Sequence, residues 1–212
     1  MKKLWLALWV CAALLPRAAA LSAAAAVTMD ADTGETLFAE NADSRLPMAS
    51  TTKIMTALVA LGEGDLDRVY TVKKQYAAVE GSSMYLEEGE RLTLRDTLYG
   101  LLLSSGNDAA AAVAGECGGG RAFVDKMNAK AREPGLTDTR FENPSGLPSD
   151  GHYTTARELA KITAAALRDP VFRDIVSTKT CTAAGRTLVN HNRLLSLYED
   201  AIGVKTGFTR AA

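Results

Sequence analysis

Hydrophobic residues follow two different spacings along the chain, one typical of strands and one typical of helices. Short stretches with strand-like character lie near the beginning, where 23–40 predicts two strands around the turn at 30–34. Similar stretches lie near the end, at 178–182, 187–191 and 202–209. Helical spacing fills the middle of the chain. We therefore predict an α+β fold in which the N-terminal and C-terminal strands form one antiparallel sheet, packed against a central cluster of helices.

Helices are predicted where hydrophobic residues recur every three or four positions and a start or stop signal flanks them. The segment after Pro47 shows this pattern clearly, because Ile54, Leu58 and Leu61 share one face and Gly62 ends the helix. Two later helices are preceded by capping signatures. The signatures lie at 93–96 and 155–158, and the expected helices cover 50–61, 94–103, 108–117, 123–133, 156–167 and 171–176.

Residues 1–20 have the pattern of a secretory signal peptide. A basic start precedes a short apolar run over 4–15, and Ala18-Ala19-Ala20 supplies the small residues that suit cleavage after Ala20. An uncleaved membrane anchor is the alternative, but Pro16 and Arg17 make the apolar run too short for a comfortable span. We expect an exported, extracytoplasmic protein, in the cell envelope or periplasm.

The rest of the chain, 21–212, is expected to be one catalytic domain. A hydrophobic share of 47% and a charged share of 23% are ordinary for a globular protein, so the composition indicates no special class. Loss of the signal peptide removes three basic residues and no acidic ones, which leaves 21 basic against 25 acidic residues and a net charge of −4. That balance argues against nucleic acid as a partner.

The cysteines and histidines give no sign of a metal site. Cys117 and Cys181 remain after export and could form a disulfide or be small buried residues; the sequence leaves both open. His152 and His191 are the only histidines, and neither has metal-ligand spacing. We expect no metal and no cofactor.

Three short motifs carry the candidate chemistry. They are Ser50-Thr51-Thr52-Lys53, Ser105-Gly106-Asn107 and Lys205-Thr206-Gly207. Each one alone is ordinary: a helix start with a solvated lysine, a turn, and the end of an edge strand. Together, the first heads a helix, the second lies between two helices and the third lies in a strand-like segment. That placement is typical of penicillin-binding proteins and class A β-lactamases.

The residue types suit nucleophilic catalysis. Serine is a weak nucleophile at neutral pH and needs an adjacent base. Lys53 lies one helical turn from Ser50, and burial near a second cation such as Lys205 would lower its pKa enough for it to accept a proton. Ser105 can relay a proton between Lys53, Ser50 and the leaving amine.

The remaining motif residues suit substrate binding. Asn107 offers a carboxamide to a substrate amide, and Lys205 with Thr206 can hold a substrate carboxylate. Gly207 lets a peptide lie close to the strand backbone.

The sequence resembles the D-alanyl-D-alanine carboxypeptidases of the low-molecular-mass penicillin-binding proteins, serine peptidase family S11, from about Ala25 to the last residue. Besides the three motifs, the resemblance includes "MASTTKIMTA", "LLLSSGNDAA", "FENPSGLP", "HYTTARELA" and "GVKTGFT". It implies a β-lactamase/transpeptidase-like fold. It also implies a peptidoglycan stem peptide ending in D-Ala-D-Ala as substrate, and β-lactam antibiotics as covalent inhibitors.

The resemblance also implies roles for individual residues. Ser50 would form the acyl-enzyme, Lys53 would be the general base and Ser105 the proton shuttle. The backbone N–H groups of Ser50 and Phe208 would form the oxyanion hole.

Members of this family continue past Lys-Thr-Gly with further strands and a helix. They usually add a β-rich second domain and a C-terminal segment that associates with the membrane. The chain ends at Ala212. We therefore expect the last strands of the catalytic domain to be missing, and membrane attachment only through a segment that is not present.

Two other functions remain as alternatives. A class A β-lactamase would need Ser-Asp-Asn at 105–107 and an E-x-x-L-N loop, and Glu142 beside Asn143 has the wrong spacing for that loop. A non-catalytic protein that binds peptidoglycan or β-lactams and turns over slowly, if at all, is the alternative from a different class. Release of D-alanine would separate it from a carboxypeptidase.

Overall fold

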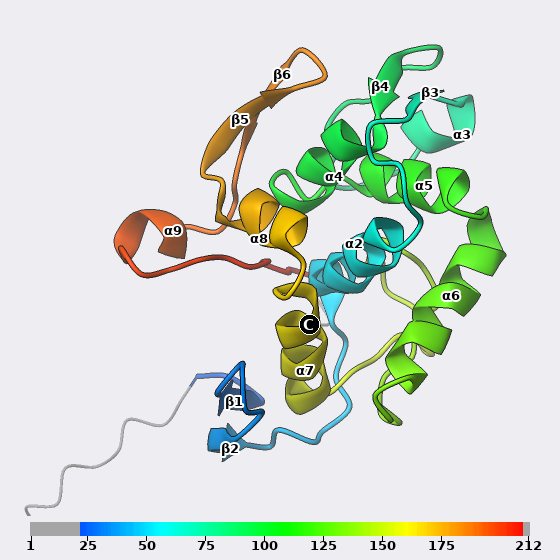
Figure 1. Ribbon diagram of the computed structural model, residues 1–212. Helices are drawn as coiled ribbons and strands as arrows, with labels where there is room; N and C mark the ends of the chain where they lie inside the picture. Colours follow the sequence, from blue (N-terminus) through cyan, green and yellow to red (C-terminus); the bar gives the residue numbers. More distant parts are fainter. Residues whose placement is uncertain (1–21, 210–212) are drawn as a thin grey trace, which may run out of the picture.

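The computed structural model describes residues 22–209, and its helices gather around one central helix, α2 (Figure 1). The helices are η1 (Ala49–Thr52), α2 (Lys53–Leu61), α3 (Lys74–Ala77), α4 (Leu94–Leu102), α5 (Asn107–Glu116), α6 (Gly120–Arg132), α7 (Ala156–Ala166), α8 (Pro170–Ser177) and α9 (Leu194–Leu197). Helices α4, α5, α6, α7 and α8 all contact α2. The predicted cluster of helices in the middle of the chain is therefore confirmed.

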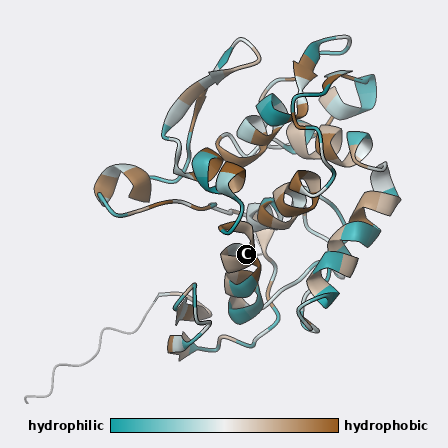
Figure 2. Ribbon diagram, viewed as in Figure 1, coloured by the Kyte–Doolittle hydropathy of each residue, from teal (hydrophilic) through white to brown (hydrophobic). Residues whose placement is uncertain are grey.

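The central helix α2 is buried on almost all sides. Ile54, Met55, Ala57 and Ala60 belong to the hydrophobic core, and hydrophobic positions concentrate on α2 (Figure 2). The first residue of the helix is Lys53, whose side chain is fully buried. A charged residue in such a place requires polar partners, because burying an unpaired charge is very costly.

The strands form three separate antiparallel pairs within the described residues. They are β1 (Ala26–Met29) with β2 (Thr36–Glu40), β3 (Val69–Thr71) with β4 (Arg91–Thr93), and β5 (Thr180–Ala183) with β6 (Arg186–Val189). The α+β class is thus confirmed. Within the described residues no ladder joins the N-terminal strands to the C-terminal strands as expected, because β1–β2 and β5–β6 are separate two-stranded sheets.

The last predicted strand, 202–209, is also not a strand in the structure. It is an extended segment without a ladder partner, and it runs from α9 back toward the start of α2 (Figure 1).

Several helix starts follow the predicted cap chemistry. Thr93 and Asp96 form a complete capping box at α4. The Thr155 side chain accepts a hydrogen bond from the Glu158 N–H at α7, and Asp169 caps α8. Caps depend on residues a few positions apart, which is why the sequence predicted the first two of these helix starts well.

Three further points concern segments and residues singled out in the sequence. The predicted signal peptide lies outside the described residues. Over 22–209, no helix is both long enough and apolar enough to cross a membrane. Cys117 and Cys181 are free thiols, so the structure does not contain the disulfide that the sequence left open.

Candidate active site

Ser50 and Lys53 meet where the short helix η1 runs directly into α2. Ser50 belongs to η1, and Lys53 is the first residue of α2. Three residues of helical backbone place both side chains on one face. As a result Lys53 Nζ lies 3.0 Å from Ser50 Oγ. The nucleophile and base that the sequence predicted are in direct contact.

Two further oxygen atoms hold the Lys53 amine. Asn107 Oδ1 lies 2.8 Å from Nζ, and the backbone carbonyl oxygen of Ser145 lies 2.6 Å from it. Asn107 begins α5, and Ser145 lies in the loop between α6 and α7. Segments far apart in the sequence therefore converge on one buried amine.

The environment of Lys53 lowers its pKa to about 7, mainly through burial and then through the positive charge of Lys205. The carboxylate of Asp108 opposes this shift. The amine is therefore neutral in a substantial fraction of molecules at neutral pH. A neutral amine can accept a proton, as a general base must.

The two fixed acceptors also orient that amine. A carbonyl oxygen and a carboxamide oxygen can only accept hydrogen bonds, so Asn107 and Ser145 take up the two hydrogen atoms of a neutral Lys53 amine. The lone pair is then left facing the Ser50 hydroxyl. This geometry prepares Lys53 to remove the proton from Ser50 Oγ.

The loop that supplies the Ser145 carbonyl is held by one side chain. Asn143 Oδ1 accepts hydrogen bonds from the backbone N–H groups of Ser145, Gly146 and Leu147, and Asn143 Nδ2 donates to the carbonyl of Leu147. The sequence analysis considered Asn143 only as part of a missing β-lactamase motif. Its role is to fold the loop that positions Lys53.

Hydrogen bonds hold the Ser-Gly-Asn motif and the residue after it, Asp108. Asn107 Nδ2 donates to the carbonyl of Glu80, and Asp108 accepts from the backbone N–H groups of Met84 and Leu86. Asn107 Oδ1 also accepts a hydrogen bond from Lys53. The predicted role of Asn107 toward a substrate amide stays a prediction.

Ser105 is buried and has a positive φ of 61°, which is rare for a residue other than glycine and is often found at functional sites. Within residues 22–209 its hydroxyl makes no hydrogen bond to Ser50 or Lys53. Its predicted proton relay therefore stays a prediction. Catalytic hydrogen bonds often tighten only when substrate is bound.

The Lys-Thr-Gly segment lies against the backbone of Ser50. A Cβ atom on Gly207 would lie 3.2 Å from Ser50 N, so glycine allows a close approach here. Burial lowers the pKa of Lys205 to about 8, and its Nζ donates to the carbonyl of Thr206 at 2.7 Å. The next residue, Phe208, has a side chain that is 86% exposed. The segment thus brings a cation and exposed backbone beside the nucleophile.

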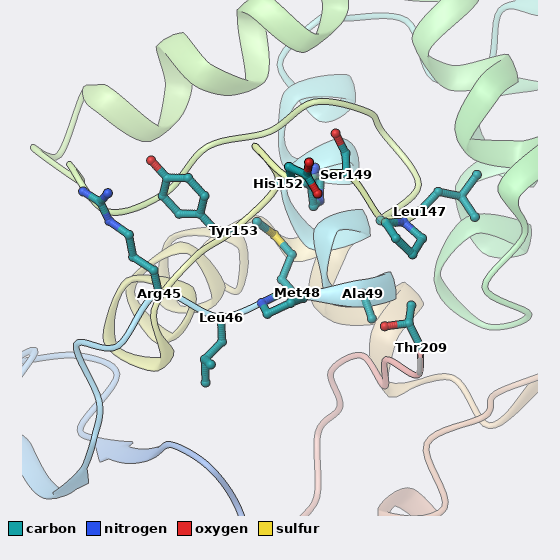
Figure 3. Close-up of a pocket in the computed structure, with 13 residues that line it drawn as sticks. Arg45, Leu46, Met48, Ala49, Leu147, Ser149, His152, Tyr153 and Thr209 are labelled. Carbon is teal, nitrogen blue, oxygen red and sulfur yellow. The ribbon is translucent and has the colours of Figure 1, made fainter. Parts of the chain in front are cut away.

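A pocket of about 320 Å³ lies next to Ala49, the residue before Ser50 (Figure 3). Met48, Leu147, His152 and Thr209 are among its lining residues. The pocket joins the loop around Leu147 to the end of the Lys-Thr-Gly segment. It does not contain the side chains of Ser50 and Lys53, so it is a neighbour of the catalytic centre.

The whole sequence, compared with known proteins, matches the peptidase S11 family, D-alanyl-D-alanine carboxypeptidase, over residues 12–212. The chain belongs to this family. A D-alanyl-D-alanine carboxypeptidase from Streptomyces sp. strain K15 is 39% identical over 210 residues, which cover 88% of this chain and 72% of the relative. DacF, a D-alanyl-D-alanine carboxypeptidase of Bacillus subtilis, is 40% identical over 202 residues. That match covers 90% of this chain but 52% of DacF, so the chain spans about half the length of this relative.

The fold of this S11 peptidase also matches solved structures. A variant of the Streptomyces K15 DD-transpeptidase has a TM-score of 0.88 and 38% identity, covering 92% of this chain and 84% of that one. The transpeptidase-like fold expected from the resemblance is therefore confirmed, and with it the membership in a family of serine peptidases.

The structure of this S11 chain brings together four of the eight predicted site residues. Lys53 is in direct contact with both Ser50 and Asn107, and Gly207 lies close to the backbone of Ser50. The sequence analysis missed the Ser145 carbonyl. "FENPSGLP" was the available signal, but a backbone carbonyl leaves no mark of its own in a sequence.

Proposed function

We propose that the protein is a serine D-Ala-D-Ala carboxypeptidase that removes the terminal D-alanine of peptidoglycan stem peptides through an acyl-enzyme on Ser50. The observation that carries this proposal is the contact of Ser50 Oγ with a Lys53 amine whose pKa is lowered to about 7. Family membership supports the substrate class. The same chemistry makes β-lactams covalent inhibitors.

Acylation begins when the neutral Lys53 amine takes the proton of Ser50 Oγ. The oxygen attacks the carbonyl carbon of the penultimate D-alanine, and the carbonyl oxygen becomes negatively charged. Backbone N–H groups of Ser50 and Phe208 stabilise this charge, which is commonly a large contribution to catalysis. The closeness of Gly207 to Ser50 N supports this placement.

The intermediate then expels the terminal D-alanine as the C–N bond breaks. Its amine takes a proton from Lys53 through the hydroxyl of Ser105. Water later attacks the ester on Ser50, which releases the shortened peptide and restores the free enzyme. Lys205 and Thr206 bind the terminal carboxylate, because Lys205 places a cation beside the nucleophile.

Replacement of the nucleophile tests this proposal. Ser50→Ala should gain no mass on incubation with penicillin, while the matched control Ser44→Ala, at an exposed serine, should gain the mass of one β-lactam. Mass spectrometry of the intact protein gives the answer. An adduct on Ser50→Ala would contradict the assignment.

D-alanine release from a peptide ending in D-Ala-D-Ala tests the turnover itself. An unmodified protein that forms the penicillin adduct but releases no D-alanine would be a binding protein, the alternative from a different class.

A peptidoglycan substrate also requires that the protein acts outside the cytoplasm. Export through the signal peptide, with cleavage after Ala20, is part of this proposal, and N-terminal sequencing of the secreted protein should begin at Leu21.

A further inference from the structure

The peptide unit between Ala49 and Ser50 is held in an unusual conformation. Ala49 is buried and has a φ of +46°, which side chains other than glycine rarely adopt. Its carbonyl oxygen accepts a hydrogen bond from Thr52 Oγ1 at 2.8 Å. Such strain persists only where surrounding contacts impose it.

His152 determines which way the Thr52 hydroxyl points. His152 Nδ1 accepts a hydrogen bond from the Glu142 N–H at 3.0 Å, so the ring proton of the neutral imidazole is on Nε2. His152 Nε2 then donates to Thr52 Oγ1, 2.7 Å away. The Thr52 hydroxyl is left to donate its own hydrogen to Ala49. Each of the three hydrogen bonds, from the Glu142 N–H through His152 and Thr52, is donated toward the Ala49 oxygen.

The His152 imidazole is buried and stays uncharged, so it can serve as a fixed hydrogen-bond donor. Only 5% of His152 is exposed, and its ring packs edge-on against Phe141 with 5.9 Å between centroids. Burial lowers the pKa of His152 to about 4, so the ring stays neutral at physiological pH. His152 Nε2 therefore keeps its proton and remains a hydrogen-bond donor to Thr52.

Holding the Ala49 oxygen also aims the Ser50 N–H. A trans peptide unit is planar, and its C=O and N–H point in opposite directions. Fixing the carbonyl therefore fixes the N–H. The backbone at two glycines packs closely against the same unit, since a Cβ on Gly146 would lie 1.8 Å from the Ala49 oxygen and a Cβ on Gly207 would lie 3.2 Å from Ser50 N.

We propose that His152, acting through Thr52, is a positioning residue that aims the Ser50 N–H at the oxyanion. The inference rests on the proposed function, because it presumes an acyl-enzyme on Ser50. The His152 ring does not touch substrate. It acts by orienting the Thr52 hydroxyl, which in turn holds the peptide unit.

A merely structural role for this chain of hydrogen bonds predicts a different outcome from a positioning role. Structural damage would slow all substrates alike. A misdirected oxyanion donor would slow substrates with an oxygen at the reacting carbonyl more than substrates with sulfur there, because sulfur is the weaker hydrogen-bond acceptor. Matched ester and thionoester substrates that differ only in this atom separate the two roles.

The test uses Thr52→Val, which keeps the branched shape but removes the hydroxyl, and Thr52→Ser, which keeps the hydroxyl. His152→Leu removes the first donor, and His152→Gln keeps an N–H donor. We expect Thr52→Val and His152→Leu to lower kcat/KM for the ester on the order of tenfold to a hundredfold. We also expect a smaller loss for the thionoester, and substantial recovery of the ester rate in Thr52→Ser and His152→Gln.

Equal losses for ester and thionoester in Thr52→Val would overturn the proposal, as would an unchanged ester rate. Thermal melting of each variant identifies misfolding. If Thr52→Val does not fold, the ratio of the ester rate to the thionoester rate in His152→Gln and Thr52→Ser decides. Both variants retain the hydrogen-bond donors, so a changed ratio in both would overturn the proposal. Failure of the proposed function is a separate result, because it would appear as a penicillin adduct on Ser50→Ala.

Discussion

Asn107 Oδ1 accepts a hydrogen bond from Lys53 Nζ at 2.8 Å, although the two residues are 54 positions apart in the chain. This contact connects the Ser-Gly-Asn motif to the Ser-x-x-Lys motif. It also explains why a carboxamide suits the position: it accepts a hydrogen bond from the amine without adding the negative charge that would keep the amine protonated.

Replacing Asn107 by aspartate should therefore raise the pKa of Lys53. A carboxylate in contact with the amine favours its charged form, which is inactive as a base. The rising limb of the acylation rate against pH should move upward by about one pH unit or more. The rate of β-lactam acylation between pH 5 and 10 measures this. The control is Asn41→Asp, which adds the same charge at an exposed position. If the rising limb of the pH profile does not move in Asn107→Asp, the role of Lys53 as base is contradicted.

Removing the Lys53 amine should nearly abolish acylation. Lys53→Ala should lower the second-order acylation rate on the order of a thousandfold or more, as expected for a member of a catalytic unit. Lys53→Arg should be similarly inactive, because arginine does not give up its proton at this pH. Stopped-flow or gel-based labelling with a fluorescent penicillin measures the rate. Lys179→Ala, at an exposed lysine, should acylate normally. A near-normal rate in Lys53→Ala would mean that another group is the base.

The pH profile of peptide hydrolysis should be bell-shaped. Lys53 must be neutral, so kcat/KM should rise as pH passes about 7, and Lys205 must be charged to bind the carboxylate, so kcat/KM should fall as pH passes about 8. Lys205→Arg keeps the cation at all these pH values. Its profile should lose the falling limb up to about pH 10 and keep the rising limb. A fall near pH 8 that persists in Lys205→Arg would assign that limb to another group.

Gly146 should not tolerate a side chain. A Cβ there would overlap the Ala49 oxygen at 1.8 Å, and φ is +89°. Gly185 is the matched control, because its φ is +69° but a Cβ would meet nothing within 4 Å. Gly185→Ala should cost about 1 kcal/mol in the free energy of unfolding, from backbone conformation alone. Gly146→Ala should cost about 3 kcal/mol or more and slow acylation. Urea denaturation of the two variants side by side measures the difference, and equal costs would show that the contact with Ala49 is not rigid.

The local structure around the site was predictable because it depends on neighbouring residues. Helix α4 begins at the capping box of Thr93 and Asp96, and both partners lie within four positions. The contact of Ser50 with Lys53 also follows from one turn of helical backbone. The sequence therefore predicted these features from spacing and residue type.

Long-range contacts were less predictable. The sequence suggested that Asn107 binds a substrate amide, but it gave no sign that the Asn107 oxygen also holds Lys53. It suggested pairing of the first and last strands, whereas β1 and β2 pair across a short turn. In both cases several partners were chemically acceptable, and only the packing of distant segments selected one.

The sequence by itself predicted the reaction chemistry of this protein, with a serine nucleophile, a lysine base one turn away and a second cation, and it indicated the family in which they occur. Tertiary structure alone decided what makes the chemistry possible. It brought the Ser145 carbonyl to Lys53 and buried the amine enough to bring its pKa to about 7. It also joined His152 and Thr52 to the Ala49 carbonyl. The physical reason is that residue types and short spacings are visible in a sequence, whereas burial and backbone hydrogen bonds arise only when distant segments pack together.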